Sequence, residues 1–172
     1  KTKTSSNQNR TVDSRFAPRI ISEENAFIVD SLMKEVVSNG TAKAALQLNR
    51  SDLAGKTGTT NNYFDAWFTG YNPDVVTSVW VGFDSPQDLG KGESGARAAL
   101  PIWIDYMRVA LENRPDLERE IPEKIVELRT NPISGLRATE EESDAYLEFF
   151  VRGSEPPFPD PESLIDPIQG LF

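Results

Sequence analysis

The residues best suited to chemistry lie in one short segment, Ala-Gly-Lys-Thr-Gly-Thr-Thr, at positions 54–60. Side chains alternate along a β-strand, so Thr57 and Thr59 would share one side and Lys56 and Gly58 the other. Two hydroxyls on one side can hold a carboxylate, and a glycine lets a ligand backbone approach the strand edge. Such an edge can bind an extended peptide as an added strand, and a backbone N–H there can form half of an oxyanion hole.

Two questions about this segment stay open at the level of sequence. Strict alternation does not bring the Lys56 ammonium beside the threonine hydroxyls, so a twisted edge or a reoriented side-chain stem would be needed. Lys-Thr-Gly is also a common tripeptide, and an ordinary strand is the alternative interpretation when the motif stands alone.

The composition removes several other chemistries. The 172 residues include no histidine and no cysteine, which excludes a triad built on either residue, a histidine- or thiolate-ligated metal and a disulfide within this chain. The net charge of −9 disfavours nucleic acid and anionic lipid as partners. No apolar run is long enough to cross a bilayer, and neither a metal nor a cofactor is expected.

A helix is predicted to precede the segment. Ser22 is a suitable N-cap, and Glu23 and Glu24 place negative charge in the first turn, where the helix dipole favours it. Asn39-Gly40 is a suitable C-terminal stop. Between these ends, one apolar stripe is expected to face the core; its members are Val29, Leu32, Met33, Val36 and Val37.

Three strands with short connections are predicted next, which favours an antiparallel sheet. Their ranges are Leu53–Thr60, Asp65–Tyr71 and Val75–Phe83. Pro73 suits the second position of a tight turn between the last two strands. Four large aromatic residues are expected to pack in the core rather than form a ligand platform; they are Trp67, Phe68, Trp80 and Trp103.

A glycine-rich loop, Gly90–Gly95, follows the predicted sheet. Residues 92–95 either line the mouth of the site or simply connect two elements. Ala96–Leu111 is predicted to be a helix with Pro101 in its first turn. The later features are, in order, a strand at Lys124–Thr130, a turn at 131–135, a solvated acidic run at Glu140–Asp144 and a proline-rich stretch from Glu155.

Several motifs flank the Lys-Thr-Gly segment in a fixed order. They are Val36-Val37-x-x-Gly40-Thr41-Ala42, then Asp65-Ala66-Trp67-Phe68-x-Gly70-Tyr71-x-Pro73, Val79-Trp80-Val81-Gly82-Phe83-Asp84 and Ala98-Ala99-x-Pro101-Ile102-Trp103. From about Ile20 to Met107 the chain resembles class A (bifunctional) penicillin-binding proteins, particularly the 1A type, with weaker matches at 127–135 and 148–156. The resemblance implies an α/β sandwich, an antiparallel sheet flanked by helices of the serine β-lactamase and DD-peptidase type, of which this chain holds only the C-terminal part.

In that family the nucleophile is the serine of a Ser-x-x-Lys motif, and a Ser-x-Asn motif completes a proton relay. The resemblance implies that Lys56 supports this relay and attracts the substrate carboxylate, which the Thr57 and Thr59 hydroxyls bind. The Thr59 N–H would pair with the N–H of the serine as the oxyanion hole. Gly58 and Thr60 would complete the segment that binds the acyl-donor peptide or a β-lactam.

Two matches to the missing motifs are interpreted as coincidences. Ser-Leu-Met-Lys at 31–34 fits Ser-x-x-Lys, but helical spacing places Ser31 and Lys34 opposite the apolar stripe, beside Asp30 on a solvated face. Ser-Ser-Asn at 5–7 fits Ser-x-Asn, but both matches stand in the wrong order relative to Lys-Thr-Gly for the family. The chain alone is therefore expected to form no covalent adduct with penicillin.

The predicted organisation is a leader or interrupted loop at 1–19, the C-terminal part of a transpeptidase domain at 20–115 and an extension at 116–172. The resemblance implies D-alanyl-D-alanine transpeptidation through a serine ester in peptidoglycan cross-linking, on the periplasmic face of the inner membrane, with an anchor N-terminal to this chain. The expected partners are the upstream part of the domain, peptidoglycan stem peptides and β-lactams. A serine β-lactamase and a non-catalytic penicillin-sensing or scaffold module are the alternatives.

Overall fold

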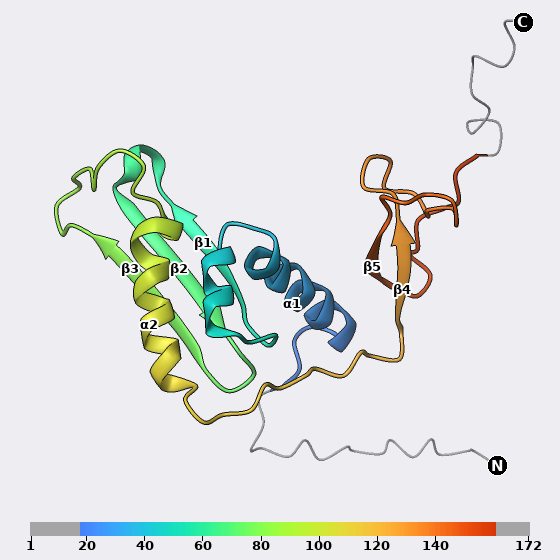
Figure 1. The fold of residues 1–172 in the computed structure, drawn as a ribbon, viewed down its shortest axis with the longest axis horizontal. Coiled ribbons are helices and arrows are strands. Elements are labelled where there is room, and N and C mark those ends of the chain that lie inside the picture. The colour runs from blue at the N-terminus through green and yellow to red at the C-terminus, as the bar shows by residue number, and fades with distance from the viewer. Residues whose placement is uncertain (1–17, 161–172) are drawn as a thin grey trace, which may run out of the picture.

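The Lys-Thr-Gly segment lies in β1 (Ala54–Thr59), an edge strand of a three-stranded antiparallel sheet with the order β1-β2-β3 (Figure 1). The computed structural model describes residues 18–160, and in it β2 spans Asp65–Tyr71 and β3 spans Val76–Gly82. A short 3₁₀ turn, η2 (Asn61–Tyr63), joins β1 to β2. The three strands predicted from the sequence agree with these bounds to within one residue at each end.

The turn between β2 and β3 is closed by Asn72. Its N–H donates to the Val75 carbonyl at 2.9 Å, and its side-chain oxygen accepts the N–H groups of Asp74 and Val75 at 3.2 and 2.8 Å. Pro73 follows Asn72 and presets the backbone for a tight turn, as the sequence predicts. The side-chain NH₂ of Asn72 is left to bind another segment, and it does so near the start of β1.

One face of the sheet is covered by α2 (Leu100–Ala110), and the core lies between them (Figure 1). Phe68 and Trp103 are fully buried, and their rings meet edge to face at a centroid distance of 5.0 Å. The Trp103 indole N–H donates to the Gly70 carbonyl at 3.2 Å, so the buried ring keeps its polar group paired. Smaller residues fill the rest of this core; they are Val37, Ala42, Ala45, Leu53, Ala99, Leu100, Ile104, Met107 and Leu111.

Trp67 and Trp80 lie on the opposite face of the sheet and are each 44% exposed. They are register partners on β2 and β3, with ring centroids 6.1 Å apart, and the Trp80 indole N–H donates to the Asp65 carboxylate at 2.9 Å. The prediction that all four aromatics pack in the core is confirmed for Phe68 and Trp103 and wrong for this pair. Strand alternation separates the two sets, because only one face of the sheet packs on α2.

A π-helical turn, η3 (Gly95–Ala99), leads into α2. The sequence predicted one helix over nearly the same residues, with Pro101 in the first turn, and the proline does stand at the start of α2. The structure differs from this prediction in the wider π-helical turn that precedes Pro101. Gly95, at its start, lies against β1.

The helix before the site is α1 (Glu23–Ser38), which begins where the sequence predicts. The Ser22 hydroxyl caps it by accepting the Asn25 N–H at 3.1 Å. It ends at Asn39, whose N–H donates to the Glu35 carbonyl at 2.9 Å. A 3₁₀ helix, η1 (Lys43–Leu48), then leads toward β1.

The buried side of α1 agrees with the predicted apolar stripe at Val37, which lies in the core, but differs from it nearer the start of the helix. Val29 and Leu32 are 49% and 55% exposed, whereas Asp30 is only 5% exposed. Asp30 tolerates burial because the Tyr71 hydroxyl donates to it at 2.9 Å and Arg119 pairs with it at 3.9 Å. The prediction that this face is solvated is therefore wrong.

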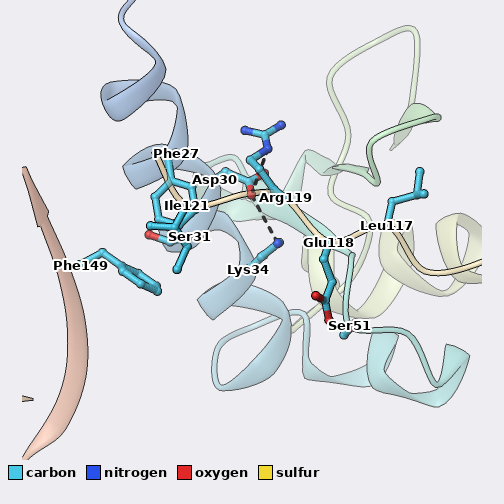
Figure 2. A pocket seen from close by; sticks show the side chains of 10 residues that line it. All are labelled: Phe27, Asp30, Ser31, Lys34, Ser51, Leu117, Glu118, Arg119, Ile121 and Phe149. Carbon is cyan, nitrogen blue, oxygen red and sulfur yellow. Dashed lines mark ion pairs between the residues drawn. The ribbon is translucent and has the colours of Figure 1, made fainter. Parts of the chain in front are cut away.

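A separate two-stranded sheet pairs β4 (Ile125–Thr130) with β5 (Tyr146–Val151). The sequence predicted β4 and the turn after it, but not β5. Phe149 of β5 meets Phe27 of α1 edge to face at 5.1 Å, and both line a pocket between α1 and residues 117–121 (Figure 2). Within residues 18–160, no helix combines the length and apolar character needed to span a membrane.

Candidate active site

The outer edge of β1 presents backbone groups to its surroundings. Thr60 N–H donates to the Asp65 carbonyl at 3.1 Å, directly across the β1–β2 ladder. In an antiparallel pair, residues alternate between bonding to the neighbour and facing away from it. The N–H and C=O groups of Thr57 and Thr59 therefore face outward. This edge has the geometry that an added peptide strand or a developing oxyanion requires.

The Lys56 side chain reaches from its own face of the sheet to this edge. Its ammonium donates to the Thr57 carbonyl at 2.9 Å, and the residue is exposed. The flexible four-carbon stem carries the charge around the strand, which answers the question that alternation left open. A cation thus stands beside the outward N–H groups of Thr57 and Thr59, a combination that attracts an anion.

Thr57 and Thr59 share the other face, as predicted, and other elements hold both hydroxyls. Thr57 Oγ1 lies 2.9 Å from Thr41 Oγ1, in the segment that follows α1. Thr59 Oγ1 accepts the Gly95 N–H at 3.0 Å. Because accepting a hydrogen bond leaves the hydroxyl proton available, Thr59 can still donate to a ligand.

Gly95 lies so close to the sheet that no side chain fits there. An added Cβ would overlap the Trp67 carbonyl oxygen and lie 2.6 Å from the Gly58 carbonyl oxygen. The sequence left two interpretations of residues 92–95, a connection or a part of the site. The last of these residues contacts β1 itself, which favours the second interpretation.

Thr60 differs from the other predicted binding residues because its hydroxyl is used within the chain. It accepts the Asp65 N–H at 2.8 Å and donates to the Asp65 carboxylate at 3.3 Å. These bonds close the connection between β1 and β2 around η2. In this arrangement Thr60 stabilises the end of the strand, and its hydroxyl proton is already engaged.

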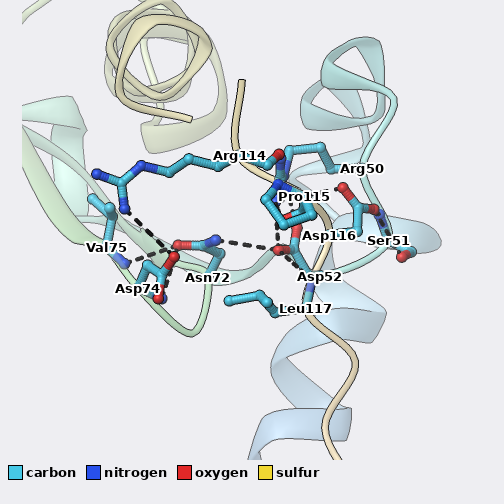
Figure 3. Close-up of polar contacts among 10 residues, drawn as sticks. All are labelled: Arg50, Ser51, Asp52, Asn72, Asp74, Val75, Arg114, Pro115, Asp116 and Leu117. Atoms are coloured by element: carbon cyan, nitrogen blue, oxygen red, sulfur yellow. Dashed lines mark hydrogen bonds and ion pairs between the residues drawn. The ribbon is translucent and has the colours of Figure 1, made fainter. Parts of the chain in front are cut away.

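A buried carboxylate just before β1 fixes the start of the strand (Figure 3). Asp52 accepts two hydrogen bonds from Arg50, at 2.8 and 2.6 Å. It also accepts the Asn72 side-chain amide at 3.1 Å and the Leu117 N–H at 3.2 Å. These bonds join the approach to β1, the β2–β3 turn and the chain after α2, so β1 cannot shift along the sheet without breaking them.

Arg50 completes this cluster. It donates to the carbonyls of Arg114 and Pro115 at 2.8 and 2.9 Å and pairs with Asp116 at 3.4 Å. Burial alone would raise the pKa of Asp52, but its hydrogen bonds, that from Arg50 first, outweigh burial and hold this pKa below its ordinary value. The bond to Asp52 raises the pKa of Arg50, so both groups are charged at neutral pH.

Ser31 and Lys34 line the pocket between α1 and the extension, which no residue of β1 lines (Figure 2). The Ser31 hydroxyl donates to the Ile28 carbonyl at 2.8 Å, and the Lys34 ammonium lies 3.5 Å from the Asp30 carboxylate. A nucleophilic serine needs a base that accepts its proton, and this hydroxyl gives its proton to the helix backbone. The Ser-Ser-Asn match at 5–7 lies outside the described residues.

The acidic run before β5 serves the loop in which it stands. Glu142 accepts the Thr139 N–H at 2.9 Å and the Asn131 side-chain amide at 2.5 Å. The backbone bond from Thr139 is the main cause of its lowered pKa. In the part of the chain that the structure describes, no cluster of three or more acidic residues is arranged to hold a metal ion.

Sequence reasoning missed the roles of Thr41, Gly95 and the Arg50–Asp52 pair at this site. Thr41 does follow a predicted helix stop, and Arg50 and Asp52 are opposite charges just before a predicted strand. Their partners in other elements lie 16 to 66 residues away along the chain, however, so the contacts themselves leave no local signal.

A family model described as "Penicillin binding protein transpeptidase domain" matches residues 2–103. Fold and site thus define the class of protein: the chain belongs to the penicillin-binding protein transpeptidase family. The predicted likeness to class A proteins of the 1A type is confirmed by the relatives, which are named Penicillin-binding protein 1A. The sequence from Pseudomonas aeruginosa is 50% identical over 141 residues, and that from Neisseria lactamica is 51% identical over 110 residues.

A solved structure confirms the predicted fold class. The crystal structure of Penicillin-Binding Protein 1A from Haemophilus influenzae matches with a TM-score of 0.76 and 39% sequence identity, over 82% of this chain and 22% of that chain. The Pseudomonas aeruginosa match likewise covers 82% of this chain and 17% of the relative, and the Neisseria lactamica match covers 64% and 14%. The chain therefore spans only about a sixth of the length of these sequence relatives.

Proposed function

We propose that this chain supplies the Lys-Thr-Gly wall of a serine D-alanyl-D-alanine transpeptidase that cross-links peptidoglycan stem peptides and is acylated by β-lactams. The observation that carries the proposal is the edge of β1, where the Lys56 ammonium lies 2.9 Å from the Thr57 carbonyl, beside the outward N–H groups of Thr57 and Thr59. Membership of the transpeptidase family supports the same conclusion.

The acyl donor binds along this edge. Its terminal carboxylate accepts hydrogen bonds from the Thr57 and Thr59 hydroxyls and is attracted by the Lys56 charge. Gly58 has no side chain, so the donor backbone can approach the strand. Thr60 supports this binding segment by closing the end of β1 onto Asp65. A β-lactam presents the same carboxylate and enters by the same contacts.

Acyl transfer uses a serine from the upstream part of the domain. Its oxygen attacks the carbonyl of the penultimate D-alanine, and the proton passes through a relay that Lys56 supports. The tetrahedral oxyanion accepts hydrogen bonds from the Thr59 N–H and the serine N–H. The C–N bond breaks and the terminal D-alanine leaves with a proton. The amine of a second stem peptide then attacks the serine ester: the new amide bond forms, the ester C–O bond breaks, and the proton lost by the amine returns to the serine oxygen.

This proposed function implies three partners: the upstream part of the domain, peptidoglycan stem peptides and β-lactams. The enzyme works on the periplasmic face of the inner membrane, where an anchor N-terminal to this chain holds it. The relatives named Penicillin-binding protein 1A support this placement.

The test measures acylation of the complete domain, including the upstream serine, by a fluorescent penicillin. Lys56→Met keeps the stem and removes the charge, and we expect the acylation rate to fall about 100-fold or more, the size of a lost proton-transfer or electrostatic contribution. Lys43→Met is the matched control because it removes another exposed lysine, in η1. Ser31→Ala is a second control, and both are expected to label at the wild-type rate.

Five results would contradict the proposal. If Lys56→Met is labelled at the wild-type rate, acylation does not need the Lys56 charge. Loss of labelling in Ser31→Ala, or a covalent adduct on this chain alone, would show that the nucleophilic serine lies in this chain. An acyl-enzyme that hydrolyses within seconds would identify a β-lactamase, and a complete domain that binds penicillin without a covalent bond would identify a sensing or scaffold module.

A further inference from the structure

Thr41 lies outside β1, and its side chain contacts a hydroxyl of the Lys-Thr-Gly segment. It follows the C-terminus of α1, and its Oγ1 lies 2.9 Å from Thr57 Oγ1. Thr41 is exposed and Thr57 is half-buried, so both hydroxyls remain partly open to a ligand. No step of the proposed function assigns a role to Thr41.

The backbone around Thr41 is held firmly. The N–H of Gly40 donates to the Glu35 carbonyl at 3.0 Å, and the N–H of Ala42 donates to the Val36 carbonyl at 2.9 Å. Gly40 packs so tightly that an added Cβ would lie 2.8 Å from Val36 Cα, and Ala42 is fully buried. Thr41 therefore stands between two fixed residues, and its hydroxyl is held at a set position beside β1.

The direction of the Thr41–Thr57 hydrogen bond determines whether Thr57 can donate its own proton to a ligand. A threonine hydroxyl has one proton to donate and can accept through its lone pairs. Thr57 can give its proton to a carboxylate only when it does not give that proton to Thr41. If Thr41 is the donor in the pair, Thr57 Oγ1 accepts, and its own O–H is directed away from Thr41.

We propose that Thr41 is a positioning residue for carboxylate recognition: it donates to Thr57 Oγ1 and so orients the Thr57 hydroxyl toward the carboxylate of the acyl donor. The inference rests on the proposed function and adds a residue to the same site. Thr41 acts through Thr57, so its effect depends on both the Thr57 hydroxyl and a carboxylate on the substrate. A group that stabilised only the fold would depend on neither.

The experiment compares two acyl donors in the complete domain. One is a D-alanyl thioester whose leaving group ends in a carboxylate, and the other is the same thioester ending in a carboxamide. For Thr41→Val, which keeps the shape and removes the hydroxyl, we expect kcat/KM to fall about 3- to 10-fold with the carboxylate, the size of one net hydrogen bond, mainly through KM. With the carboxamide the change should stay below about 2-fold, because the oriented hydroxyl has no anion to meet.

Two further variants separate positioning from folding. Thr41→Ser keeps the hydroxyl and should restore the wild-type rate. Ser38→Ala removes a hydroxyl at the end of α1 that donates to the Lys34 carbonyl and the Glu35 carboxylate and accepts from the Asn39 side-chain amide. None of these partners lies in β1, so this control should leave both rates unchanged. In a Thr57→Val background, Thr41→Val should cause no further loss, because the two residues act as a unit.

The outcomes distinguish this inference from the proposed function. If the wild-type domain is acylated and Thr41→Val matches it with the carboxylate donor, the inference alone is wrong. An equal loss with both donors, or an additive loss in the Thr57→Val background, would also overturn it, since either result indicates a structural role. If the wild-type domain is acylated by neither donor nor by penicillin, the proposed function fails and the inference fails with it.

Discussion

The two sheets of this chain are stabilised in different ways. The three-stranded sheet packs on α2 around fully buried side chains such as Phe68 and Trp103. In the β4–β5 sheet, by contrast, Ile125 and Thr130 are the buried residues, and side chains such as Leu147 stay largely exposed. Two strands alone are marginally stable in water. The strand with the Lys-Thr-Gly segment therefore belongs to a region with its own core, whereas the hairpin depends on docking to that region.

Few contacts provide this docking. Phe149 packs on Phe27, and Lys124 lies 3.9 Å from Glu24 at the surface, where an ion pair contributes little. The Asp52 cluster does not contact the hairpin itself, but it is buried and holds the chain after α2 at Leu117, ahead of β4 (Figure 3). The comparison predicts that substitutions in the core unfold both sheets, whereas substitutions at the docking surface release the hairpin alone.

The largest effect is expected from Trp103→Ala, which empties the centre of the core. We expect the free energy of unfolding to fall by about 4 kcal/mol, through lost burial and the cavity left behind. Urea denaturation of the complete domain measures it. Val109→Ala, on the exposed side of the same helix, is the matched control and should change stability by less than about 0.5 kcal/mol. A small effect of Trp103→Ala would mean that this core does not support the sheet.

A smaller loss, about 3 kcal/mol, is expected from Asp52→Asn, because it removes the carboxylate that lies closest to the buried Arg50 charge and leaves the more distant Asp116. The effect depends on pH in a defined direction. The pKa of Asp52 is lowered by folding from its ordinary value of 3.8, so its contribution is present at neutral pH and disappears as the pH falls below about 4.

Denaturation at a series of pH values checks this behaviour. The difference between wild type and Asp52→Asn should be constant from pH 7 to about pH 5 and should shrink below about pH 4. Asp105→Asn, on the exposed side of α2, serves as the control and should show little difference at any pH. A difference that grows as the pH falls would contradict the assigned shift.

The smallest effect is expected from Phe149→Ala, which removes the edge-to-face contact with Phe27. We expect about 1 kcal/mol, the size of an aromatic pair, and we expect it in the hairpin only. Hydrogen exchange should become faster for amides of β4 and β5 and stay unchanged for β1–β3. Leu147→Ala, at an exposed site on the same strand, is the control. Faster exchange in β1 as well would show that the two sheets unfold as one unit.

The elements that the sequence predicts correctly are those determined by nearby residues. β2 follows from a run of aromatic and β-branched residues that ends at Asn72-Pro73, and both turn residues act locally. The start of α1 follows from Ser22, whose partner is three residues away. In each case the physical cause lies within a few positions of its effect.

The errors arise where distant partners decide burial. The stripe on α1 predicted buried Val29 and Leu32, yet Asp30 is buried instead, because Tyr71 and Arg119 come from later segments to pair with it. An apolar pattern shows which side chains can be buried, but not which face of the helix finds a partner. Strand β5 was missed for a similar reason, since it pairs only with β4 and has little buried surface.

For the site, the sequence predicts the strand and the shared side of its two threonines. It does not predict that Lys56 folds over to the Thr57 carbonyl, because that depends on a flexible stem. Nor does it predict the contact of Thr41 with Thr57, which requires the end of α1 to meet β1. The roles of these residues in acyl transfer remain predictions that the proposed experiments test.

The contact between Gly95 and β1 also limits how this site can diversify. The atoms that any side chain at position 95 would meet first belong to the main chain of Trp67 and Gly58, so no compensating substitution can make room for it. The residues that supply the cation and the hydroxyls of β1 can be substituted one at a time, whereas position 95 requires glycine. If the proposed site is correct, substitutions that change its ligand preference are expected at Lys56, Thr57, Thr59 and the side chains that touch them, and not at position 95.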